Sequence, residues 1–159
     1  MSDKVINKKR KGIFLVAVDE SEEFLAAVNY ATKFANAENG YVALLNVIEP
    51  LHVQNWKNIE DRVRSEMRAH AEQVIWNAAG CVFEKTGKIP MVCIEEGDKS
   101  DLIIKTINEN ENIVALVLAS HSATSIPGPL VSYFSGKGLS RLPVPLIIVP
   151  GHLEHCCGC

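Results

Sequence analysis

The run Gly12-Ile13-Phe14-Leu15-Val16-Ala17-Val18 carries no polar side chain and ends directly at Asp19-Glu20-Ser21. A strand with one face in water would alternate apolar and polar residues, and this run does not alternate. Such a run is typical of a parallel sheet, in which helices cover both faces of each strand. We therefore predict a strand over residues 12–18 that is buried on both sides.

An amphipathic helix is predicted immediately after this strand. Ser21 is a favourable N-cap residue, and Glu22 and Glu23 would then lie in the first turn, where the helix dipole favours acidic groups. Asn39-Gly40 supplies a helix stop. Apolar residues recur at three- and four-residue steps along one face, at Phe24, Ala27, Val28, Ala31, Phe34 and Ala35.

The same alternation of strand and helix continues along the chain. Further apolar runs predict strands at residues 41–48, 89–94, 113–119 and 144–149. The predicted helices between them are a long one with an apolar stripe from Trp56 to Val82, a short one over residues 100–110 and a weak one over residues 129–141. This order indicates an α/β domain with an open five-stranded parallel sheet and helices on both faces, Rossmann-like in architecture.

The length of 159 residues suits one domain. We divide the chain into a basic lead-in at residues 1–11, the α/β domain at 12–150 and a Cys/His-rich tail at 151–159. The net charge of −3 gives no reason to expect a nucleic-acid partner. Lys8-Lys9-Arg10-Lys11 is interpreted as a solvated lead-in, with an anionic partner as the alternative.

The location of the protein is predicted from what the sequence lacks. No segment approaches the roughly twenty apolar residues of a membrane helix, and the first apolar run is too short for a secretory signal. We therefore expect a cytoplasmic protein with no membrane partner. In that compartment the thiols of Cys81 and Cys93 should stay reduced and pack as small apolar side chains.

A ligand site in an open parallel sheet lies at the carboxyl ends of the strands, near the point where strand order reverses. The segments expected there are Asp19-Glu20-Ser21, Val47-Ile48-Glu49 and residues 119–133. Two common phosphate motifs are excluded. The Rossmann glycine triplet is absent, and Ser135-Gly136-Lys137-Gly138 lacks both the first glycine and the final hydroxyl residue of a Walker loop.

Five short blocks resemble the universal stress protein family, in family order and at family spacing. They are Val16-Ala17-Val18-Asp19-Glu20-Ser21, Leu44-Leu45-Asn46-Val47-Ile48-Glu49-Pro50, Glu96-Gly97-Asp98, Leu116-Val117-Leu118-Ala119-Ser120-His121-Ser122 and Pro143-Val144-Pro145-Leu146-Ile147-Ile148-Val149. Each block is weak alone, but the five together extend over nearly the whole chain. The resemblance implies a five-stranded parallel sheet and a homodimer, which we expect to form through the edge of the fifth strand.

One branch of that family binds ATP through three glycines and a small hydroxyl residue. The resemblance places these positions at Ala119, Ser122, Ser132 and Tyr133. Glycine lets the backbone approach phosphates closely, and N–H groups at a helix start hold the negative charge. All three glycines are replaced here, and we expect the Tyr133 ring to lie where the phosphates would bind, which should weaken phosphate binding.

The resemblance also places Asp19 near the ribose or a metal ion and the backbone of Val47 beside the adenine. For Asp19, a helix-leading acid that interacts with the dipole is the alternative. We predict that ATP or another adenine nucleotide, if bound, contacts Ala17, Val18, Asp19, Val47, Ala119, Ser120, His121, Ser122, Ser132 and Tyr133.

Catalysis is not expected. Ser120 and His121 are adjacent, but neighbouring loop residues rarely point toward each other, and no acidic residue is placed to orient the ring. We therefore predict no catalytic residues and no enzyme activity.

The tail His152-Leu153-Glu154-His155-Cys156-Cys157-Gly158-Cys159 concentrates thiols and imidazoles. Three interpretations remain open: a solvent-exposed tail without a role, a zinc, copper or redox site, and a lipid-attachment signal.

Three functions are therefore considered. The first is a homodimeric stress-response regulatory module with an altered adenine-nucleotide pocket, acting on regulatory protein partners that the sequence does not identify. The second is a true ATP-binding sensor with slow hydrolysis. The third is a metal- or redox-responsive protein that acts through the tail.

Overall fold

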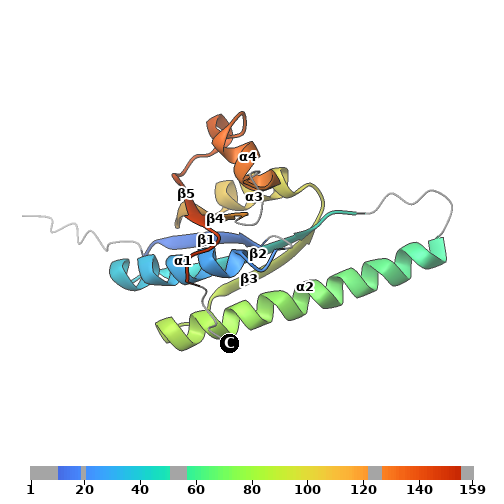
Figure 1. Ribbon diagram of the computed structural model, residues 1–159, viewed down its shortest axis with the longest axis horizontal. Helices are drawn as coiled ribbons and strands as arrows, with labels where there is room; N and C mark the ends of the chain where they lie inside the picture. The colour runs from blue at the N-terminus through green and yellow to red at the C-terminus, as the bar shows by residue number, and fades with distance from the viewer. Residues whose placement is uncertain (1–10, 19–20, 51–56, 122–126, 155–159) are drawn as a thin grey trace, which may run out of the picture.

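The structure, a computed structural model, describes residues 11–18, 21–50, 57–121 and 127–154. Strands and helices alternate along them (Figure 1). In chain order they are β1 (Ile13–Val18), α1 (Phe24–Glu38), β2 (Tyr41–Ile48), α2 (Lys57–Thr86), β3 (Met91–Glu96), α3 (Lys99–Glu109), β4 (Ile113–Ser120), α4 (Pro129–Ser135), the 3-10 helix η1 (Leu139–Arg141) and β5 (Leu146–Pro150).

The strands form one open sheet in the order β3-β2-β1-β4-β5, and every neighbouring pair is parallel. This confirms the predicted sheet. β1 lies in the centre, where Val16 pairs with Leu44 of β2 and with Val117 of β4. The chain moves outward from β1 to β3 and then crosses to β4, so strand order reverses between β1 and β4.

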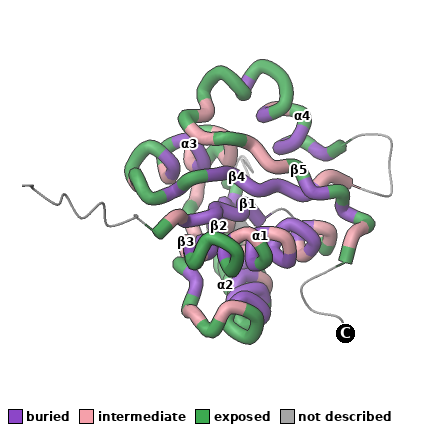
Figure 2. Tube along the Cα trace, turned by 90° about the vertical axis from the view of Figure 1, so that its left-hand side faces the viewer, coloured by how far each residue is buried: buried purple, intermediate pink, exposed green. Residues whose placement is uncertain are grey.

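Helices cover both faces of the sheet, as predicted. α1 and α2 pack on one face and α3 and α4 on the other (Figure 2). Phe14 and Val16 of β1 pack into the α1–α2 layer, whereas Leu15 and Ala17 pack into the α3–α4 layer. No residue of β1 is more than 8% exposed. Successive side chains therefore enter two different cores, which is why the sequence of β1 shows no alternation.

Two strands begin two residues later than predicted, and each begins directly after a proline. β3 starts at Met91 after Pro90, and β5 starts at Leu146 after Pro145. Proline has no backbone N–H and cannot donate to a sheet ladder. The predicted weak helix is likewise shorter, because it divides into α4 and η1 around Gly136 and Gly138.

The prediction that Ser21 caps the first helix is wrong. Residues 21–23 form a turn, in which the N–H of Phe24 donates to the Ser21 carbonyl at 3.4 Å. The N-cap residue of α1 is Glu23, and no acidic residue lies in the first helical turn. Ser21 thereby stays at the end of the sheet, beside the segment that follows β1.

α2 is the longest helix, and its predicted apolar stripe faces the sheet. Ala71, Ala78 and Val82 on this stripe are buried, whereas Trp76 beside it is exposed. Trp56, the predicted start of the stripe, lies outside the described residues. Within the described part of the chain, no helix combines the length and apolar character that a membrane crossing requires.

The two cysteines within the domain differ. Cys93 is free and half-buried, as expected, and burial raises the pKa of its thiol, with the Glu95 carboxylate at 3.5 Å adding to the effect. Cys81 is buried but disulfide-bonded, which contradicts the expectation of a reduced thiol. That expectation considered only the redox compartment, whereas pairing depends on which thiols the fold brings together. Within the described residues no metal-ligand cluster occurs, and residues 155–159 of the tail are outside them.

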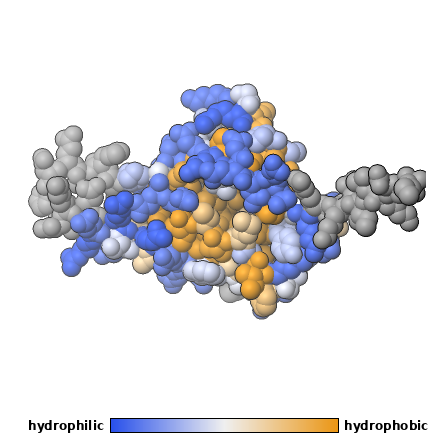
Figure 3. Space-filling model, turned by 180° about the vertical axis from the view of Figure 1, so that it is seen from behind, coloured by the Kyte–Doolittle hydropathy of each residue, from blue (hydrophilic) through white to orange (hydrophobic). Residues whose placement is uncertain are grey.

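Large apolar side chains are exposed at both edges of the sheet. Met91 on β3 is 51% exposed and Ile148 on β5 is 41% exposed. Seen from behind, hydrophobic surface gathers over the middle of the molecule below a hydrophilic region (Figure 3). Contiguous apolar surface of this kind commonly marks a contact area for a partner.

The turn between α1 and β2 requires a glycine at position 40. Gly80, inside α2, is not required in this way. Asn39 takes the left-handed conformation at the end of α1, with φ 53°, and a Cβ on Gly40 would lie 2.3 Å from the Gly12 carbonyl oxygen. Around Gly80 there is open space.

We predict opposite effects for the two alanine substitutions. Gly40→Ala forces two backbone segments apart and should cost about 1–3 kcal/mol of unfolding free energy, as other overpacked sites do. Gly80→Ala should add about 0.5–1 kcal/mol, because alanine is the better helix former. Urea unfolding of both variants measures this, and equal effects of the two would contradict it.

Candidate functional site

Two adjoining cavities open at the carboxyl ends of the strands. The larger, of about 560 Å³, lies between the end of β2, the start of α1 and α2. The smaller, of about 270 Å³, lies between the end of β4 and the start of α4. Ser21, Glu49 and Lys99 line both cavities, which are therefore neighbouring compartments of one groove. The groove lies at the point where strand order reverses, the usual ligand position in such sheets.

The wall of the larger cavity is mainly apolar. Val18 and Val47 reach it from the ends of β1 and β2, and Met67 and Val74 reach it from α2. Polar side chains, among them His70 and Asn46, are interspersed with this apolar surface. Apolar walls with a few fixed polar groups suit a flat heteroaromatic ligand.

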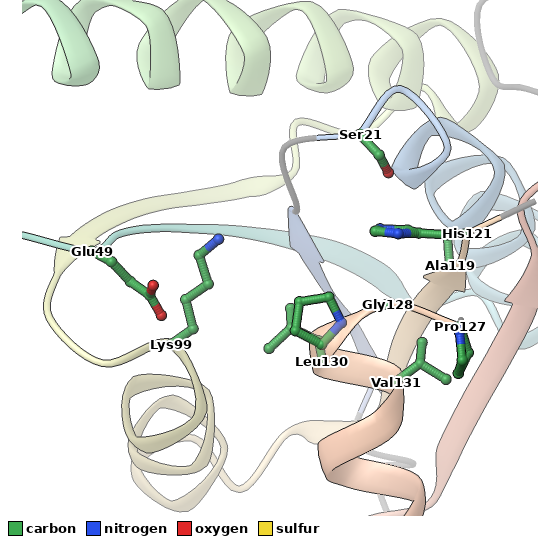
Figure 4. Close-up of a pocket in the computed structure, with 10 residues that line it drawn as sticks. Ser21, Glu49, Lys99, Ala119, His121, Pro127, Gly128, Leu130 and Val131 are labelled. Carbon is green, nitrogen blue, oxygen red and sulfur yellow. The ribbon is translucent and has the colours of Figure 1, made fainter. Parts of the chain in front are cut away.

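The residues at the end of β4 and the start of α4 form one wall of the smaller cavity. The His121 N–H donates to the Pro127 carbonyl at 3.1 Å, which joins the end of β4 to the start of α4. Gly128 follows with φ 98° and ψ 157°, a conformation that is almost restricted to glycine. A Cβ on Gly128 would lie 3.0 Å from His121 Nε2. The imidazole is thus packed against bare backbone at the cavity wall (Figure 4).

Lys99 brings positive charge to the groove. It is the first residue of α3 and follows a turn in which the Gly97 N–H donates to the Ile48 carbonyl at 3.0 Å. Asp98 caps α3, since its side chain accepts from the Asp101 N–H at 2.9 Å. The turn therefore ties the start of α3 to the end of β2 and fixes where the Lys99 side chain begins.

The charged groups that line the groove are few. Lys99 and Glu49 extend next to each other on one side of it, and Leu130 lies on the other side (Figure 4). Glu22 adds a second carboxylate at the larger cavity. Among the described lining residues, two carboxylates thus accompany one ammonium group, so the groove is not strongly basic.

Four of the predicted ligand contacts line the groove. Val18 and Val47 line the larger cavity, and Ala119 and His121 line the smaller one. Ala17 and Ser120 do not line either: Ala17 is buried in the α3–α4 layer, and the carbonyl oxygen of Ser120 would lie 2.2 Å from a Cβ on Gly151. Asp19 and Ser122 fall outside the described residues.

Ser132 and Tyr133 are not brought to the cavities. Ser132 is exposed on α4, and the Tyr133 hydroxyl accepts from Arg141 Nη1 at 2.6 Å. Arg141 also donates to Asp101 at 2.9 Å, so the phenol is tied to the start of α3. α4 begins at Pro129, which places Tyr133 a full turn inside the helix. Its ring therefore faces η1 and α3 and does not fill either cavity, contrary to our expectation.

Sequence reasoning missed the contribution of the helices to the groove. Lys99, Met67 and His70 are not among the predicted contacts, because strand ends and family motifs do not point to helical residues. Lys99 had a usable signal, since it follows the turn Glu96-Gly97-Asp98 after a strand. Met67 belongs to the predicted apolar stripe that covers the sheet. Nothing in the sequence distinguishes it from those residues of the stripe that pack on the sheet without lining the groove.

The chain is thus an open parallel α/β protein with a ligand-sized groove at its switch point. It belongs to the universal stress protein family, whose family model matches residues 12–150. This confirms the resemblance that the five sequence blocks indicated. No curated protein matches the chain.

Solved structures of the same family share the fold. The universal stress protein UspA from Lactobacillus plantarum is 20% identical, with a TM-score of 0.76, covering 88% of this chain and 98% of its own. A universal stress protein in complex with cAMP is 18% identical, with a TM-score of 0.59 and coverages of 88% and 97%. The universal stress protein from Archaeoglobus fulgidus in complex with dAMP is 13% identical, with a TM-score of 0.55 and coverages of 88% and 98%.

We predict that Gly128→Ala destabilises the loop beside the smaller cavity. The strained backbone should cost about 1–3 kcal/mol, and the new methyl group also crowds the His121 ring. Gly87→Ala is the control, because Gly87 has φ 69° but no atom within 4 Å of the place that a Cβ would take. Chemical unfolding should show the larger loss for Gly128→Ala, and an equal loss would mean that contact with His121 is unimportant.

Proposed function

We propose that this stress-response protein is a regulatory module that binds an adenine nucleotide without transforming it. The observation that carries the proposal is the pair of adjoining cavities at the switch point. One is mainly apolar, and the other is lined by the imidazole of His121. A base and a phosphate require these two environments side by side.

The adenine is assigned to the larger cavity. Val18, Val47 and Met67 offer apolar surface to both sides of a flat ring. The Asn46 side chain, also at this cavity, already donates to the Ala71 carbonyl at 3.4 Å, which fixes its orientation. The family relatives solved with cAMP and dAMP support an adenine ligand for this fold.

The phosphate is assigned to the smaller cavity, which lies at the end of β4 and is also lined by Lys99. The pocket is altered from the glycine-based pattern, since Ala119 occupies the first glycine position. Close packing of the His121 ring against Gly128 favours a binding role over a proton-transfer role for this imidazole. We therefore propose that nucleotide occupancy is the signal and that hydrolysis plays no part in it.

The test is isothermal titration with AMP and ATP, which should reveal a site with Kd below about 100 µM for at least one of them. Met67→Trp fills the larger cavity with an indole and should weaken binding at least tenfold. Met91→Trp is the matched control, because Met91 is an exposed methionine on β3 that lines neither cavity.

Circular dichroism must show that both tryptophan variants are folded. Absence of heat with either nucleotide in the wild-type protein would refute the proposal. Release of inorganic phosphate from ATP at a rate that Met67→Trp abolishes would support the alternative, an ATP sensor with slow hydrolysis.

We also propose that the protein forms a homodimer through β5. β5 is an edge strand with apolar Leu146, Ile147 and Ile148, and its outer backbone groups face no further strand of the described sheet. Unpaired edge strands with exposed apolar residues tend to pair with another chain. A second copy of the chain brings the same edge strand. Pairing of the two β5 strands would satisfy their unpaired backbone groups and cover their exposed apolar side chains.

Ile148→Lys should shift the protein from dimer to monomer, because it places a charge at the centre of the proposed contact. Met91→Lys, at the opposite edge of the sheet, should leave the dimer intact. Light scattering at tens of micromolar protein measures both masses. A monomeric wild-type protein, or dissociation by Met91→Lys alone, would exclude the β5 interface.

A further inference from the structure

We infer that Lys99 is the phosphate-binding residue of this groove and that it makes the groove selective for a nucleoside monophosphate over a triphosphate. The inference rests on the proposed function, because it assigns the charged end of the ligand whose base occupies the larger cavity.

Lys99 has the right position to contact a phosphate from either compartment. It lines both cavities, together with Ser21 and Glu49, and its side chain extends beside Glu49 (Figure 4). It is partly buried, so the ammonium group is less screened by water than that of a fully exposed lysine. A ligand that spans the two compartments would therefore lie beside the residues that line both, Lys99 among them.

The charge of Lys99 is not neutralised within the described residues. No carboxylate of the described residues lies within the 4.0 Å of an ion pair with Lys99, although Glu49 is its neighbour in the groove. The other cations near the sheet end are engaged. Arg64 bonds Glu96 through Nε at 2.9 Å, which lowers the pKa of that carboxyl, and Arg141 bonds Asp101.

Backbone hydrogen bonds hold the residues on both sides of Lys99, so the position of its Cα is fixed. The Gly97 N–H is bonded to Ile48, and the Leu102 N–H donates to the Asp98 carbonyl at 3.0 Å in the first turn of α3. Only the side chain has to order when a ligand binds. This lowers the entropic cost of forming a charge-assisted hydrogen bond to a phosphate oxygen.

The balance of charge favours one phosphate over three. A monophosphate brings up to two negative charges to one ammonium group, whereas ATP without a metal brings about four. The extra phosphates would meet the carboxylate of Glu49, which lines the smaller cavity. Ala119 at the smaller cavity also replaces a glycine that would let the backbone approach a phosphate chain.

The experiment compares adenosine, AMP and ATP by titration, in EDTA so that no metal neutralises the phosphates. The wild-type protein should bind AMP at least tenfold tighter than adenosine and tighter than ATP. Lys99→Gln should remove the advantage of AMP over adenosine, whereas Lys99→Arg should retain most of it. Lys105→Gln is the control, because Lys105 lies on the same helix, pairs with Glu109 at 3.9 Å and lines neither cavity.

Salt dependence gives a second readout. Raising the salt concentration should weaken AMP binding in the wild-type protein and in Lys105→Gln, but much less in Lys99→Gln. Equal binding of adenosine and AMP, an unchanged AMP preference in Lys99→Gln, or tighter binding of ATP than of AMP would overturn the inference. In each of these cases adenosine or nucleotide still binds, so the proposed function stands. If none of the three ligands binds, the proposed function itself fails.

Discussion

The burial of β1 on both faces is the constraint on which the rest of the structure depends. Its alternate side chains enter two separate cores, one under α1 and α2 and one under α3 and α4. A strand in that position can only be central, with a parallel neighbour on each side. The chain runs from β1 to β2 and β3 on one side and then crosses to β4 and β5 on the other side. The connections that follow β1 and β4 therefore leave the sheet toward opposite faces. The groove is the space that this divergence leaves.

Much of the fold was predictable because it follows from local patterns. Apolar runs identified all five strands. In β1, β2 and β4 burial on two faces removes most polar residues, whereas the edge strands β3 and β5 are mainly apolar but partly exposed. The errors have local causes as well. Pro90 and Pro145 cannot donate to a ladder and delay β3 and β5, and a turn at residues 21–23 delays α1. The disulfide state of Cys81 was not predictable, because thiol pairing depends on distances between segments far apart in the sequence.

The candidate site was predictable only where strands supply it. Val18, Val47, Ala119 and His121 are at or next to strand ends, and the structure places these four predicted residues at the groove. Tyr133 was misplaced because its direction depends on where α4 begins and on a hydrogen bond with Arg141. Side chains that enter the groove from helices, such as Met67, carry no strand-end signal. Which helical side chains line the groove becomes clear only from how the helices pack on the sheet.

The hydrogen-bonded chain Tyr133–Arg141–Asp101 connects parts of the molecule that the sequence keeps far apart. Asp101 lies in the first turn of α3, two residues after Lys99, and Arg141 ends η1, shortly before the edge strand β5. The segment that leads into the edge of the sheet cannot move relative to α3 while these bonds persist. Any rearrangement at that edge, including the dimer contact that we propose for β5, must therefore either break the hydrogen bonds of Arg141 or shift the start of α3, from which Lys99 extends.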